Sequence, residues 1–209
     1  RAANGVIMIK TKSGKDTNGK VQVSYNGSIS TSRVGRLPNE QTMFGQGWSG
    51  DRALDENGSW GAAFDGKDRV WGNIVDNSQM IKPYSYLNNR IRDFYDNGLG
   101  INNALSLSGG NGPATYYLSL SQNSVDGVIP TNKDSYKRYT LSNRSSYKSG
   151  AFNFSTSINY SNETNKSMPS GQGTSMLRSL YEIANDISIV DLKDYNNKFL
   201  NLDNYFTPY

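Results

Sequence analysis

The sequence predicts an all-β protein, and two observations support that fold class. Several stretches alternate apolar and polar residues with a period of two, as strands with one buried face do. Turns rich in glycine, asparagine and aspartate separate these stretches. Nowhere in the 209 residues is there an apolar run of about 18 residues, the length that a membrane-spanning helix requires.

Composition narrows the function classes. The chain has 22 Lys and Arg against 18 Asp and Glu, and it contains neither Cys nor His. Disulfides, thiol chemistry and histidine-based acid–base catalysis are therefore excluded. The cations are scattered, so no nucleic-acid partner is expected. No nucleophile–base pair is recognisable, and the acidic loops 51–58 and 65–68 lack the calcium-loop spacing. We expect no enzyme activity, no catalytic residue, no cofactor and no metal site.

The N-terminal half contains two expected strands and one long connection. An apolar strand over 5–12 runs into a turn at Ser13-Gly14. A second strand over 20–32 alternates cleanly, with valines, a tyrosine and an isoleucine on one side and Ser, Asn and Gln on the other. The stretch 34–100 is rich in Gly, Asn and Asp and is expected to be a long irregular loop, with a short helix over 86–97.

The C-terminal half contains the other strands. Period-two alternation predicts four of them, over 101–109, 115–125, 136–148 and 151–161. A short turn joins the first of these strands to the second, another joins the third to the fourth, and a longer loop over 126–134 lies between the two pairs. The remainder, 162–209, is expected to be a long loop with a helical turn or two over 175–185.

The connections alternate between short and long. If strand direction alternates, all short turns lie at one end of the sheet and all long loops at the other, as in outer-membrane barrels. A soluble sandwich has no reason to sort its turns by length. The Ser- and Asn-rich polar faces suit a wet interior. We therefore favour a membrane barrel over a soluble all-β protein.

Three tryptophans stand out in the long connection: Trp48, Trp60 and Trp71, spaced 11 to 12 residues apart. Exposed indoles stack on sugar rings, so these residues are the candidate substrate-binding residues. A tryptophan in a long loop more often pins that loop against its scaffold. We favour the packing interpretation and keep the binding interpretation open.

Three segments carry a family resemblance. The first is RAANGVIMIKTKSG at 1–14, and the second is ENGSWG at 56–61 with FDGK at 64–67. The third region contains NNALSLSGGN at 102–111, YYLSL at 116–120, DGVI at 126–129 and YKRY at 136–139. Taken together and in this order, these segments resemble the SusC/RagA family of TonB-linked outer-membrane transporters.

The resemblance implies an architecture and a function. Residues 1–15 would be the C-terminal end of a plug domain, and residues 16–209 the N-terminal part of a transmembrane β-barrel of the 22-stranded class. Such proteins import oligosaccharides or peptides across the bacterial outer membrane, embedded in its lipid. A SusD-like surface lipoprotein acts as their lid, and TonB supplies the energy.

The family's TonB-contacting segment lies upstream of Arg1, so the resemblance assigns no residue of this chain to energy coupling. The chain opens without an initiator methionine and stops at Tyr209 without a closing element. We therefore expect it to be a piece of a larger polypeptide that aggregates or needs detergent when expressed alone.

Two alternatives stay open. In the first, the chain is a soluble or surface-bound β-rich module for glycan binding or adhesion, with the tryptophan-bearing loop as its binding site. In the second, the chain belongs to a receptor that signals through an upstream regulatory domain. A high-salt wash separates the first alternative from the transporter, because only a soluble module is released from outer membranes.

Overall fold

The computed structural model describes residues 11–171, 173, 175–200 and 208–209. The chain is mostly β and divides into two compact units, which are described one at a time. The first unit takes its described residues from 1–31, 99–126 and 135–165, and the second from 32–98, 127–134 and 166–209. The expected plug strand over 5–12 falls almost wholly outside the described residues.

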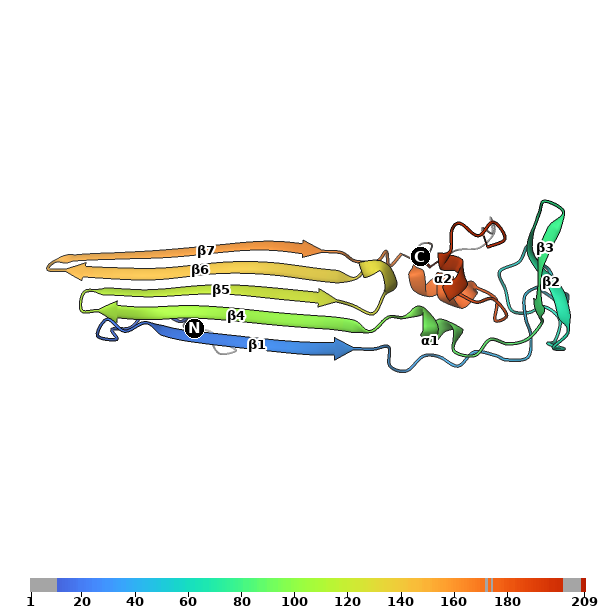
Figure 1. Ribbon diagram of the computed structural model, residues 1–209, viewed down its shortest axis with the longest axis horizontal. Helices are drawn as coiled ribbons and strands as arrows, with labels where there is room; N and C mark the ends of the chain where they lie inside the picture. The colour runs from blue at the N-terminus through green and yellow to red at the C-terminus, as the bar shows by residue number, and fades with distance from the viewer. Residues whose placement is uncertain (1–10, 172, 174, 201–207) are drawn as a thin grey trace, which may run out of the picture. The chain divides into compact units, whose positions relative to one another are not determined.

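The first unit is a five-stranded antiparallel sheet (Figure 1). Its strands, in spatial order, are β1 (Gln22–Ser32), β4 (Gly98–Asn111), β5 (Ala114–Asp126), β6 (Ser135–Ser149) and β7 (Phe152–Asn165). All five strands were predicted from the period-two alternation, and their observed bounds differ from the prediction by a few residues. Within the described residues the sheet stays open, with β1 and β7 as its edges, and no closed barrel is present.

The connections of this sheet are sorted by length. β4 joins β5 through Gly112-Pro113, and β6 joins β7 through Gly150-Ala151. Gly112 has a φ of 56° and Gly150 a φ of 57°, a left-handed conformation that glycine adopts without a steric penalty. The chain leaves the opposite end of the sheet after β1, β5 and β7, where the longer connections begin. This matches the sorting expected from the sequence.

The strand register gives the sheet one apolar face and one polar face. Leu105, Leu120, Leu141 and Tyr160 pair directly across β4 to β7 and form one row. The adjacent row on the opposite face is polar throughout, and it consists of Ser106, Ser119, Ser142 and Asn159. The large side chains of the apolar face are exposed, with Leu120 at 49% and Tyr160 at 58%. We call the side of the sheet that carries the leucine row the apolar face.

The second unit contains a hairpin that the sequence analysis missed. β2 (Asp68–Val75) pairs antiparallel with β3 (Ser78–Pro83) inside the stretch predicted to be an irregular loop. That prediction was wrong for this part of 34–100. The turn is Asp76-Asn77, with φ angles of 51° and 57°, a tight hairpin turn without the glycine that normally marks it.

The second unit also has short helices and its own core. Its helical segments are α1 (Arg90–Phe94), η1 (Pro130–Asn132), α2 (Met176–Glu182) and η2 (Val190–Lys193). The helices expected over 86–97 and 175–185 are thus present but shorter. No helix in the described part of the chain is long and apolar enough to cross a membrane.

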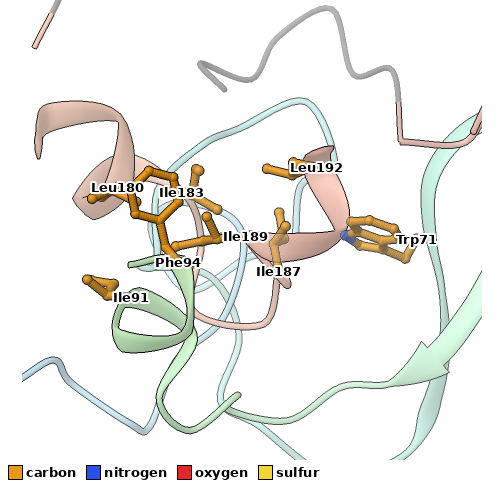
Figure 2. Close-up of a cluster of buried hydrophobic side chains, with 9 residues drawn as sticks. Trp71, Ile91, Phe94, Leu180, Ile183, Ile187, Ile189 and Leu192 are labelled. Carbon is orange, nitrogen blue, oxygen red and sulfur yellow. The ribbon is translucent and has the colours of Figure 1, made fainter. Parts of the chain in front are cut away.

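Residues far apart in the sequence build this core. Its members are Trp71, Ile91, Phe94, Leu180, Ile183, Ala184, Ile187, Ile189 and Leu192. Figure 2 shows Ile187, Ile189 and Leu192 lying between Trp71 and Phe94. The stretch 162–209, expected to be a loop, therefore supplies most of the core, because the apolar residues after α2 pack against α1 and β2.

Candidate functional site

The structure separates the three predicted tryptophans. Trp48 is 59% exposed and Trp60 is 57% exposed, whereas Trp71 is 4% exposed. Trp48 and Trp60 line one open pocket of about 510 Å³ together with Phe44, Ser49, Gly50 and Gly61. Phe44, Trp48 and Trp60 are called the aromatic platform below. All six lining residues are uncharged, so the pocket suits an uncharged ligand with an apolar surface.

Backbone hydrogen bonds hold the platform. The Trp48 N–H donates to the Asp51 carbonyl at 3.1 Å, and the Asp51 N–H donates back to the Trp48 carbonyl at 2.9 Å. The Gly50 N–H donates to the Trp60 carbonyl at 3.0 Å, which joins the two tryptophan segments. The rings of Phe44 and Trp60 are 6.4 Å apart between centroids. Two large indoles are thus presented to solvent by a hydrogen-bonded loop.

The conformation of this loop is expected to require glycine at position 47. Gly47 has a φ of 134°, and a Cβ atom added there would lie 2.0 Å from the Asp51 carbonyl oxygen. Gly47→Ala therefore breaks the Trp48–Asp51 bridge in addition to straining the backbone, and we expect a loss of well over about 2 kcal/mol in unfolding free energy.

Gly50 provides the matched control for that substitution. Its φ is 88°, but a Cβ atom there meets open space. Gly50→Ala should cost only the backbone term, about 1 to 2 kcal/mol. Chemical denaturation followed by tryptophan fluorescence measures both variants. Equal losses would show that the contact with Asp51 does not matter.

A cluster of buried polar residues in the second unit supports the platform. Four polar residues are almost completely buried: Gln46, Arg90, Asn185 and Asp186. Arg90 forms an ion pair with Glu40 and donates to the Asn185 Oδ1 atom at 2.8 Å. The Asp186 Oδ1 atom accepts a hydrogen bond from the Gln46 backbone N–H at 2.9 Å. Sequence reasoning missed these residues. The only available signal was the polar pair Asn185-Asp186 inside an otherwise apolar run.

Trp71 occupies a different environment. It borders a second pocket of about 630 Å³, and the Lys82 ammonium lies 4.8 Å from its ring centroid. Burial lowers the pKa of Lys82, and the negative charge of Asp186 partly opposes that shift. The distance between the Lys82 Nζ and Asp186 Oδ2 atoms is 3.7 Å, an ion pair longer than a hydrogen bond. The core position of Trp71 favours the packing interpretation for this residue.

No protein-family model matches the chain, and no curated protein matches it. The family resemblance therefore rests on the sequence segments quoted above. Across the ranges that the structure describes, no group of three or more acidic side chains is arranged to hold a metal ion.

Proposed function

We propose that this chain forms part of the wall of a bacterial outer-membrane barrel that imports large nutrients. The cargo is an oligosaccharide or a peptide, TonB supplies the energy, and a SusD-like lipoprotein covers the outer opening. The observation that carries the proposal is the exposed apolar face of the five-stranded sheet. The family resemblance adds the transport function to that observation.

The apolar face exposes more large apolar side chains than the surface of a water-soluble protein normally does. Its large, exposed members include Leu105, Tyr116, Leu120, Tyr139, Tyr147, Phe154, Ile158 and Tyr160. A contiguous apolar patch of this kind marks a surface that contacts lipid or another protein. In a membrane barrel such side chains face the lipid tails.

The order of side chains along the strands supports lipid as the contact. Leu105, Leu120 and Leu141 form one row of the apolar face, and the next row contains Leu107 and Leu118 beside Asn143. On β6, Tyr139 and Tyr147 lie on either side of Leu141, Asn143 and Ser145. These two tyrosines are eight positions apart, which corresponds to roughly 27 Å along the strand and to about 20 Å along the membrane normal at a strand tilt of about 40°. The apolar band of an outer-membrane barrel is about 25 Å tall and is bordered by aromatic girdles. Tyrosine suits that border because its ring is apolar and its hydroxyl is polar.

Strand length and the polar face agree with this interpretation. β4 to β7 contain 14, 13, 15 and 14 residues, more than the 9 to 11 or so that a membrane-crossing strand needs. The opposite face presents the row of Ser106, Ser119 and Ser142. A row of small hydroxyl side chains suits a water-filled interior.

A second candidate function rests on the aromatic platform. Two exposed indoles in an uncharged pocket also suit a surface module that binds glycans without transporting them. In the transport proposal the same platform contacts cargo. The two functions differ in whether the protein is integral to the membrane.

Purification from native membranes tests the proposal. Outer membranes are washed with high salt, extracted with mild detergent, and the copurifying proteins are weighed by mass spectrometry. The transporter stays in the membrane through the wash and copurifies with a lipidated partner. Release by the salt wash, as a chain without a partner, would overturn the transport proposal and favour the glycan-binding module.

A further inference from the structure

We propose that Asp186, together with its neighbour Asn185, is a positioning residue for the aromatic platform. The two residues follow α2, yet they hold the loop that presents Phe44, Trp48 and Trp60. The inference rests on the proposed contact between this platform and the cargo. It adds a pair of residues that touch no ligand and still determine whether the indoles are held in place.

The Asp186 contact fixes the beginning of the loop over 44–61, which is called the platform loop. Its side chain is fully buried, and its Oδ1 atom accepts the Gln46 backbone N–H at 2.9 Å across 140 positions of sequence. Gln46 in turn donates from its side-chain amide to the carbonyls of Leu54 and Glu56, both at 2.9 Å. Gln46 lies two positions before Trp48, so the chain around that indole is tied to Asp186 through one residue.

The Asn185 contacts fix the rest of the loop. The Asn185 backbone N–H donates to the Ser59 hydroxyl at 2.9 Å, directly beside Trp60. Its side-chain amide donates to the Gln41 carbonyl at 2.8 Å. The Gln41 side chain donates to the carbonyls of Phe44 and Ser59, at 2.7 and 2.8 Å. The network therefore holds the carbonyl of Phe44 and the residue before Trp60, and it holds Gln46 two positions before Trp48.

The chemistry of the position favours a positioning role over simple packing. Asp186 lies beside the buried Ile183, Ile187 and Ile189 in the sequence, where an apolar residue would pack without burying a charge. The Lys82 ammonium, 3.7 Å from the Asp186 Oδ2 atom, supplies the opposite charge. A buried carboxylate that accepts a backbone N–H 140 positions away orders a loop that apolar packing would leave free to shift.

Amide hydrogen exchange on the intact protein in mild detergent tests the inference. Asp186→Ala removes the acceptor, Asp186→Asn keeps an oxygen at the same place, and Asp191→Asn is an exposed control. Asp186→Ala should speed exchange over 44–61 by about tenfold or more, while peptides over 187–192 change less than about twofold. Asp186→Asn should restore most of the protection, and Asp191→Asn should change nothing.

Two results would overturn the positioning role. One is unchanged exchange over 44–61 in Asp186→Ala, and the other is an equal increase over the platform loop and the core, which indicates general unfolding. Because this measurement needs no cargo, it is independent of the transport proposal. Loss of the proposed cargo contact would show separately, as unchanged nutrient uptake when Trp48 is replaced by alanine.

Discussion

Replacing Leu120 with arginine should prevent the protein from accumulating in the outer membrane. Leu120 lies in the middle of the apolar face, paired with Leu105 on one side and Leu141 on the other. An arginine facing lipid near the bilayer midplane costs about 2 to 4 kcal/mol, which is roughly a 30- to 900-fold shift in an assembly equilibrium. The amount of protein in the outer-membrane fraction measures the effect.

Ser119→Arg is the matched control for this substitution. Ser119 is the preceding residue on β5 and lies on the polar face, between Ser106 and Ser142. The same charge on this side meets water and should leave the membrane level close to that of the unchanged protein. Equal loss with both variants would mean that arginine disturbs the strand rather than a lipid contact. Normal levels of Leu120→Arg would contradict the lipid-facing assignment.

On the proposal that the aromatic platform contacts cargo, replacing Trp48 and Trp60 with alanine should weaken cargo binding. A ligand that covers about 60 Å² of each indole gains about 1.5 kcal/mol from each contact, or about tenfold in affinity. The double variant should therefore bind about 100-fold more weakly if the two contacts are independent. Calorimetric titration of the detergent-purified protein with a panel of oligosaccharides and peptides measures these affinities.

Tyr195→Ala provides the control for the platform. Tyr195 belongs to the same unit and is 66% exposed, but it does not line the platform pocket. Its removal should leave the affinity unchanged. If the double variant binds the cargo as tightly as Tyr195→Ala does, the cargo contacts other residues, and the exposed indoles need another explanation.

The first unit was largely predictable from the sequence, whereas the second was not. Strands β4 to β7 alternate in hydrophobicity because one face of each strand is apolar and the other polar, and this periodicity is local information. Hairpin β2–β3 gives a weaker signal, because its turn is Asp76-Asn77 and its strands contain Gly72 and Pro83. The core of the second unit combines residues that precede β4 in the sequence with residues that follow β7. No local sequence pattern predicts that two such distant segments pack together.

For the candidate site, the sequence predicts the residue type, tryptophan, but neither the exposure of each tryptophan nor the residues that hold the loop. The three tryptophans are visible in the sequence, but their exposure depends on tertiary packing, which buries Trp71 and leaves Trp48 and Trp60 in solvent. Asn185 and Asp186 lie 126 to 144 positions from the residues that they hold. Only a structure shows that such distant residues meet, since each alone is an ordinary polar residue.

A scan of β5 with spin labels tests the lipid-facing assignment most directly. These 209 residues contain no cysteine, so single cysteines from Ala114 to Asp126 can each be introduced and labelled in bilayers once any cysteine elsewhere in the protein is replaced by serine. Accessibility to oxygen should peak at the even positions, highest near Leu118 and Leu120, and accessibility to a water-soluble nickel complex should peak at the odd positions. Equal access of the nickel complex to both sets of positions would contradict a membrane wall.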